Sequence, residues 1–238
     1  MRPSAAINFI VPSNLGTLVM ATGPHAVISS EEEAKAQRDF YQALGLMMAQ
    51  WARLESSMFY WFMHAIDKPE AMARAVFFSA KSFTGRRDMF NGAIPHSPFH
   101  DDIKMFLKAA SKKAGQYSTF RNRVAHGEPT FNLKKNSPTF KQYMLCEARL
   151  TRGALTVMTD DEIEITMVTN VQMTTATHNL QELVRLMWDL HPSQRAGYPD
   201  AEPKAYRLRV LQLPNLAHSK ESARIPAEQQ AQPDDPEE

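Results

Sequence analysis

The segment DDIKMFLKAASKKAGQYSTFRNRVAHG, residues 101–127, decides how this chain folds. Its apolar residues recur at steps of three and four, the spacing of one face of an α-helix. Asp101 or Asp102 is expected to cap the start of this helix. Gly127 and Pro129 supply a stop signal at its end. The apolar face comprises Ile103, Phe106, Leu107, Ala110, Ala114, Tyr117, Phe120 and Val124.

A second long amphipathic helix precedes this segment. Ser29 or Ser30 followed by three glutamates is typical of a helix start, because a hydroxyl caps the first turn and carboxylates favour the positive end of the helix dipole. The helix is expected to end near Asp67, since Pro69 disfavours helical geometry at the residue before it. Its apolar face comprises Phe40, Leu44, Met47, Met48, Trp51, Leu54, Met58, Phe62 and Ile66.

Three further stretches complete the helical part. We expect a short helix over 69–80, a turn or helix over 82–94 and a final helix over about 170–190. Residues 192–216 are predicted to be irregular, with one short strand or helix around 206–213.

The hydrophobic period changes after Pro129. Strand-like runs at 139–150, 155–157 and 163–167 are separated by turn residues, which predicts a three-stranded antiparallel meander at about 138–167. The lone Cys146 in the first run is expected in the core, not as a nucleophile. The predicted fold class is mainly α: a helical bundle with a small antiparallel β-meander inserted before the last bundle helix.

The composition predicts one globular domain with loose ends. The chain has 238 residues, of which 43% are hydrophobic, enough for a sizeable core. We expect a flexible leader at 1–28, a single domain at 29–216 and a disordered acidic tail at 217–238, where large apolar residues are almost absent.

Several classes of function find no support. One cysteine permits neither an internal disulfide nor a multi-cysteine zinc site. Prolines around 96–102 disfavour the spacing that would align two histidines on a metal, so we expect no metal and no other cofactor. No apolar run reaches eighteen residues, which predicts a cytoplasmic protein without a membrane span.

The middle of the chain is basic. The net charge is +1 overall, but residues 81–152 contain fourteen basic and five acidic residues, a net charge of +9. Such a zone suits a polyanion such as nucleic acid, although solvated helix faces are often basic too. The RNA-binding candidates within it are Lys112, Lys113, Lys134 and Lys135.

The end of the long helix, Arg121-Asn122-Arg123-Val124-Ala125-His126-Gly127, lies in this basic zone. An arginine, a polar residue directly after it and a histidine separated from the arginine by four to six residues resemble the signature of the HEPN superfamily of helical proteins. Arg121, Asn122 and His126 match that pattern. The segment Trp51-Ala52-Arg53-Leu54-Glu55 is also similar to the first-helix pattern of many HEPN families.

The resemblance implies a metal-independent endoribonuclease whose active site lies at a homodimer interface. Histidine moves protons near neutral pH and arginine stabilises a phosphate, so both residue types suit the reaction. The ribose 2′-hydroxyl would be the nucleophile, and Asn122 would orient the histidine or the phosphate. The family also suggests a toxin or phage-defence effector with an antitoxin or another regulatory protein as partner.

Helix geometry sets a condition on this interpretation. On an ideal helix the side chains of Arg121 and His126 point about 140° apart, with Arg121 in the apolar stripe. Either Gly127 ends the helix early and swings His126 round, or two chains bring their copies together across a symmetric interface.

Glu55 is expected to support the site. It lies beside the apolar face of the first helix, so a cation from another helix should meet it, with Arg121 or Arg123 as candidates. A carboxylate at the edge of the stripe that reaches water is the alternative. In the plainer interpretation of the whole motif, Arg121 and His126 complement the helix dipole, Arg121 pairs with Glu55, and the protein is a non-catalytic nucleic-acid-binding or scaffold protein.

A second pair also fits the spacing. Arg185 and His191 are separated by five residues, so spacing alone does not define a site. This pair lacks a polar residue after the arginine and lies in an ordinary amphipathic pattern. The hypothesis therefore rests on the first pair.

Overall fold

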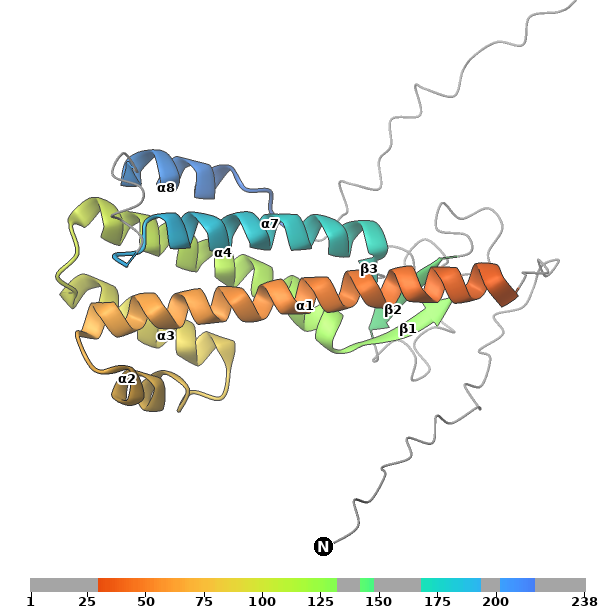
Figure 1. The fold of residues 1–238 in the computed structure, drawn as a ribbon, viewed down its shortest axis with the longest axis horizontal. Helices are drawn as coiled ribbons and strands as arrows, with labels where there is room; N and C mark the ends of the chain where they lie inside the picture. Colours follow the sequence, from red (N-terminus) through yellow and green to blue (C-terminus); the bar gives the residue numbers. More distant parts are fainter. Residues whose placement is uncertain (1–29, 132–141, 148–167, 194–201, 217–238) are drawn as a thin grey trace, which may run out of the picture.

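The computed structural model of the chain describes residues 30–131, 142–147, 168–193 and 202–216. These residues form six α-helices and a three-stranded sheet, so the fold is mainly α, as the sequence predicts. Three long helices run side by side, with the sheet at one end of the bundle (Figure 1). In chain order the elements are α1 (Ser30–Ile66), α2 (Glu70–Phe77), α3 (Phe83–Ala93), the 3₁₀ helix η1 (Ile94–His96), α4 (Asp101–Ala125), β1 (Gly127–Phe131), β2 (Tyr143–Glu147), β3 (Val168–Thr169), α7 (Asn170–Asp189) and α8 (Pro203–Gln212).

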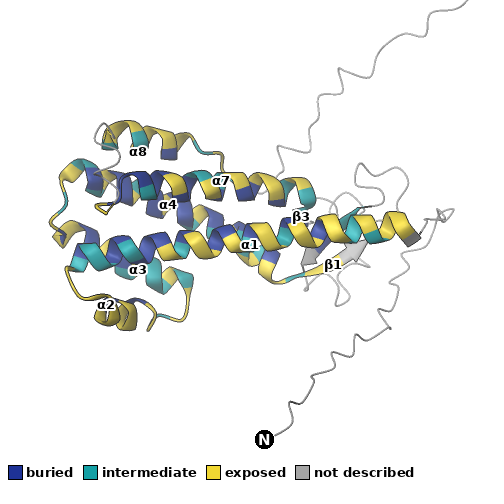
Figure 2. Cartoon of the chain, in the orientation of Figure 1, coloured by how far each residue is buried: buried dark blue, intermediate teal, exposed yellow. Residues whose placement is uncertain are grey.

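The core lies where α1, α4 and α7 face one another, and Figure 2 shows buried residues gathered on those faces. Phe40 and Leu54 of α1, Phe106 of α4 and Leu183 of α7 have no exposed surface. Fully burying one such side chain contributes about 1.5–3 kcal/mol, so the apolar stripes explain why these helices pack together.

The ends of the first helices follow their local chemistry. The predicted boundaries of α1 are confirmed, because the helix begins at Ser30 and ends at Ile66. Asp67 then adopts a left-handed backbone conformation, with φ of 48°, which turns the chain. Pro69 lies at the N-cap of α2, and the Ser82 side chain accepts from the Gly85 N–H to cap α3.

The expected cap of α4 is wrong. His100 is the N-cap residue, and its Nδ1 accepts from the Asp102 N–H at 3.3 Å. Asp101 and Asp102 instead lie in the first turn, where their charge still complements the helix dipole.

The helix predicted over about 170–190 is α7, and a capping box of Thr169 and Gln172 starts it. One more helix, α8, follows and packs on α4 and α7. Of the short strand or helix left open around 206–213, the structure has the helix, and it begins earlier, at Pro203.

The sheet is an antiparallel meander in the order β1-β2-β3, and it precedes α7 as expected. Its second strand, β2, matches the first predicted run, whereas β1 occupies residues that the sequence reads as a helix stop. Pro129 is tolerated in β1 because β1 is an edge strand. The runs expected at 155–157 and 163–167 lie outside the described residues.

The predicted leader at 1–28 and the tail at 217–238 also lie outside the described residues. None of the helices within the described ranges combines the length and the apolar character that a bilayer span requires.

Candidate functional site

The C-terminal end of α4 places His126 at the transition from helix to strand. Helix α4 ends at Ala125, and the N–H of His126 still donates to the Asn122 carbonyl at 3.1 Å. The chain then enters β1 at Gly127. The His126 side chain is exposed, and no described residue hydrogen-bonds its ring. The imidazole is therefore free to meet a ligand.

Gly127 is required at this transition because the backbone passes close to β2. A Cβ at this position would lie 2.8 Å from the Cβ of Leu145 and 3.0 Å from the Arg123 carbonyl oxygen. Any larger residue would push β1 away from β2. Gly127 thus lets β1 pack closely on β2 directly after His126, where α4 has ended.

Around the axis of α4, Asn122 lies between Arg121 and His126. At 100° per residue, the Asn122 position lies about 100° from Arg121 and about 40° from His126. Arg121 is half-buried, and its Nη1 donates to the Asn122 Oδ1 at 3.1 Å. The hydrogen bond draws the guanidinium from the apolar side of α4 toward the exposed side, where Asn122 and His126 lie.

Trp51 of α1 supports the same guanidinium. The Arg121 Cζ lies 5.8 Å from the centre of the Trp51 ring, within the range of a cation–π contact. The Arg121 Nε is buried and lacks a hydrogen-bond partner among the described residues. Asn122 and Trp51 therefore hold the Arg121 guanidinium, and an anion would have to meet its terminal nitrogens because the Nε is closed to solvent.

Glu55 has a cationic partner from another helix, as predicted, but the predicted identity is wrong. Arg86 of α3 donates from Nη2 to the Glu55 Oε1 at 2.9 Å, and the same oxygen accepts from the Trp51 Nε1–H at 3.1 Å. Both charged side chains are at most one-fifth exposed. Glu55 therefore contacts Trp51, whose ring faces Arg121, and not Arg121 itself.

The remaining predicted residues differ in burial and in their contacts. Arg123 is half-buried in the last turn of α4, and Lys112 is exposed. Lys113 is buried, and its Nζ donates to the Leu213 carbonyl at 2.7 Å and to the Asn215 Oδ1 at 2.9 Å. Burial lowers the pKa of Lys113, with a smaller effect from the charge of neighbouring Lys112. Lys134 and Lys135 lie outside the described residues.

The Lys113 contacts belong to a clasp between α4 and the segment after α8. The hydroxyl of Tyr117 donates to the Pro214 carbonyl at 2.9 Å, next to the two Lys113 bonds. Burial raises the pKa of this phenol. Lys113 is thus committed to holding the chain together, and its ammonium is not available to RNA.

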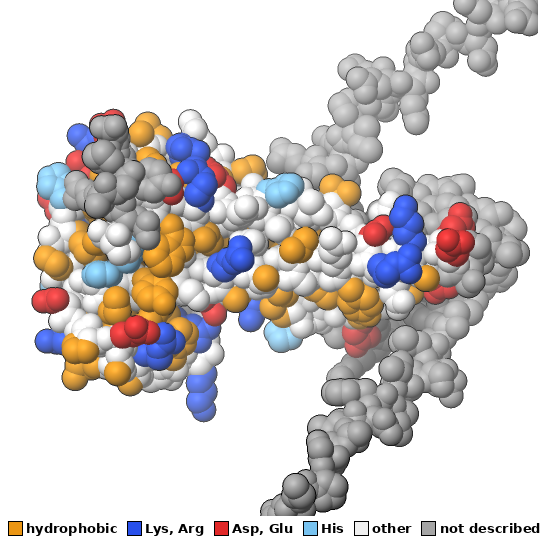
Figure 3. Space-filling model, in the orientation of Figure 1, with side chains coloured by type: hydrophobic (Ala, Val, Ile, Leu, Met, Phe, Trp, Pro, Cys, Tyr) orange, Lys and Arg blue, Asp and Glu red, His pale blue; other side chains and the backbone are white. Residues whose placement is uncertain are grey.

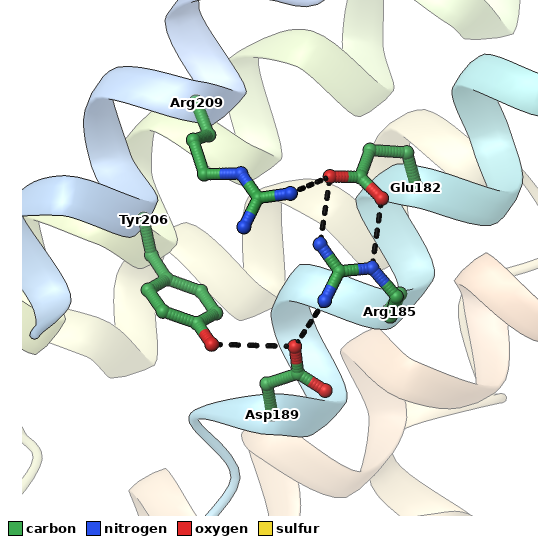
Figure 4. Close-up of polar contacts among 5 residues, drawn as sticks. All are labelled: Glu182, Arg185, Asp189, Tyr206 and Arg209. Carbon is green, nitrogen blue, oxygen red and sulfur yellow. Dashed lines mark hydrogen bonds and ion pairs between the residues drawn. The ribbon is translucent and has the colours of Figure 1, made fainter. Parts of the chain in front are cut away.

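The second Arg/His pair lies at the other end of the bundle, where Arg185 is exposed but engaged by carboxylates. Arg185 donates to Glu182 at 2.8 Å and to Asp189 at 2.6 Å, while Arg209 and Tyr206 of α8 contact the same carboxylates (Figure 4). The hydrogen bond from Arg185 lowers the pKa of Glu182. All five groups satisfy one another within the chain.

His191, by contrast, is buried. The residue is 3% exposed, and its ring centre lies about 5 Å from the ring centres of Trp61, His64 and Trp188. Burial, reinforced by His64, lowers the pKa of His191 to about 4. The ring is therefore neutral at physiological pH.

Sequence reasoning did not find Arg86, and it named Trp51 only as part of a first-helix pattern, without a role in the site. The four-residue step from Trp51 to Glu55 was a usable signal, because it places both side chains on one face of α1. Nothing in the sequence identified α3 as the source of the cation. Within the described ranges, no three His, Cys, Asp or Glu side chains gather as a metal site would require.

Comparison of the chain with family models, curated proteins and solved structures gives no match.

Proposed function

We propose that this protein is a metal-independent endoribonuclease of the HEPN type, in which Arg121, Asn122 and His126 act on RNA. One observation carries the proposal: an exposed imidazole lies at the end of α4, one turn from an Arg121–Asn122 pair oriented by Trp51. The resemblance of the motif and the basic character of residues 81–152 support it.

The reaction divides between these side chains. The ribose 2′-hydroxyl attacks the adjacent phosphorus, the bond from phosphorus to the 5′-oxygen breaks, and the products end in a 2′,3′-cyclic phosphate and a 5′-hydroxyl. The Arg121 guanidinium stabilises the charge that develops on the phosphate oxygens. His126 moves protons, and the Asn122 amide keeps the guanidinium turned toward the phosphate.

A homodimer would complete the chemistry. The 2′-hydroxyl loses a proton while the leaving 5′-oxygen gains one, so two imidazoles serve the reaction better than one. A twofold axis near the end of α4 would supply His126 from each subunit and relax the 140° separation within one chain. Such an enzyme would act in the cytoplasm as a toxin or phage-defence effector, held in check by an antitoxin or another regulatory protein.

The decisive experiment measures cleavage of single-stranded RNA in a metal chelator. We expect cyclic phosphate ends, no cleavage of DNA of the same sequence, and loss of activity in His126→Ala. His178→Ala is the matched control because His178 of α7 is also exposed. Full activity of folded His126→Ala, or activity that disappears with the chelator, would refute the proposal.

A second candidate function has one observation in its favour. Arg121 is already engaged by Trp51 and Asn122, as a structural arginine would be. In that case the protein binds RNA without cutting it. Salt-sensitive binding with full recovery of intact RNA would identify this function.

A further inference from the structure

One line along the exposed side of α4 leads directly to His126. The positions on this line succeed one another at steps of four and three, and all lie within about 40° of a common direction. Every one except Gly115 is exposed. The line consists of Lys108, Lys112, Gly115, Thr119, Asn122 and His126.

The charge along this part of α4 has one sign. Residues 103–126 contain six lysines and arginines and no carboxylate. Lys108 and Lys112 form no ion pair in the described ranges. Their ammonium groups are consequently available to an anion from solvent. By contrast, Figure 3 shows the face formed by α1 and α7, where Lys and Arg side chains are scattered among other types.

Arg87 of α3 supplies the cation that the line lacks at Gly115. A Cβ at position 115 would overlap the Arg87 guanidinium, so this side chain lies directly on the glycine. Its one carboxylate neighbour in the described ranges is Asp88, 3.8 Å away and largely exposed, which makes a weak ion pair. Arg87 thus extends the row of cations begun by Lys108 and Lys112.

We propose that Lys108, Lys112 and Arg87 form a track for successive phosphates of a single RNA strand, which delivers the strand to Asn122 and His126. The line from Lys108 to His126 is about 27 Å long, since a helix rises 1.5 Å per residue. A single row of cations follows one backbone, which favours single-stranded RNA over a duplex. The destination of the track, although not its binding, rests on the proposed function.

Gly115→Ala is the sharpest test because it neither adds nor removes a charged or polar side chain. The added Cβ displaces Arg87, while alanine favours the helix by about 1 kcal/mol, so the variant should fold at least as well. Gly92→Ala is the control: Gly92 lies in α3, the helix that carries Arg87, and a Cβ there meets nothing within 4 Å.

The probe is a fluorescent 2′-O-methyl RNA strand, which keeps the phosphates but blocks 2′-hydroxyl attack. Three phosphate contacts predict a slope of about −2 for log binding constant against log salt concentration. Losing one contact in Gly115→Ala, Lys108→Gln or Lys112→Gln should reduce the slope by about 0.7 and weaken binding about fivefold at 0.1 M salt. Gly92→Ala should bind as the unmodified protein does.

The outcomes separate this inference from the proposed function. Absence of probe binding, or equal slopes in the unmodified protein and the three track variants, would overturn the track even if RNA is cleaved. Binding that weakens as expected supports the track, and if RNA nevertheless stays intact, it is the ribonuclease proposal that fails.

Discussion

The two Arg/His pairs of this chain have nearly the same spacing and opposite surroundings. At the end of α4, His126 is exposed and Arg121 is held by the neutral side chains of Asn122 and Trp51. At the end of α7, His191 is buried and Arg185 is bound by two carboxylates. The difference arises from what packs on each helix end. The chain leaves α4 as a strand, whereas at the end of α7 rings of α1 and α7 enclose His191, and Tyr206 of α8 contacts Asp189, a partner of Arg185. Spacing selects candidates, and the packing around each pair decides which one can act.

The largest expected difference between the pairs appears when each arginine is removed. Arg121→Ala should reduce RNA cleavage about 10²–10³-fold with little change in stability, because a transition-state donor is lost. Arg185→Ala should leave cleavage intact but lower the free energy of unfolding by about 1–3 kcal/mol, since Asp189 remains largely buried without its partner. Cleavage assays and denaturant unfolding distinguish the two, and the reverse pattern would exchange the roles of the pairs.

The next largest difference is in how much each histidine contributes to the stability of the fold. His191→Ala removes a ring packed among Trp61, His64 and Trp188, and should lower the free energy of unfolding by about 2–4 kcal/mol. Exposed His126 and His178 should tolerate alanine within about 0.5 kcal/mol. Thermal and urea unfolding measure the difference. A destabilised His126→Ala variant would show that this ring is structural.

The buried ring also predicts a dependence on pH. The pKa of His191 is depressed in the folded state, so the unfolded chain binds the proton first as pH falls. The neutral ring contributes stability that is fully present above pH 6.5 and is lost as pH falls from about 6.5 to 4, by up to about 3 kcal/mol. His191→Phe should unfold with a flatter pH profile over this interval. Identical profiles would exclude His191 as the titrating group.

The smallest effect concerns the indole that orients Arg121. Trp51→Phe weakens the cation–π contact and removes the N–H that reaches Glu55, so cleavage should fall about fivefold, the equivalent of about 1 kcal/mol. Trp188→Phe is the matched control, because Trp188 contacts His191. Equal cleavage by both variants would remove Trp51 from the site.

The parts of the fold that could be predicted depend on local patterns. The bounds of α1 and α7 follow from apolar spacing, a capping residue and a proline or turn beyond the last residue. The same logic failed after α4, where Gly127 and Pro129 read as a stop signal only. Their second role depends on Leu145 of β2, which lies close to Gly127 in space but not in sequence.

The residues of the site likewise divide into those that the local sequence identifies and those that depend on how distant elements pack. Arg121, Asn122 and His126 lie within six residues, and a motif is enough to nominate them. Glu55 could be predicted to need a cation because burial of its charge is costly, but the choice of Arg86 depends on where α3 packs. Lys113 resembles its exposed neighbours in sequence, yet the acceptors that bury its ammonium lie 100 residues away.

The clasp around Lys113 and Tyr117 also orders events during synthesis. Its acceptors, near Leu213 and Pro214, leave the ribosome about a hundred residues after Lys113 and Tyr117. Until then, the ammonium and the phenol can donate only to water or to other groups. This face of α4 therefore reaches its final packing only after the segment that follows α8 has been translated.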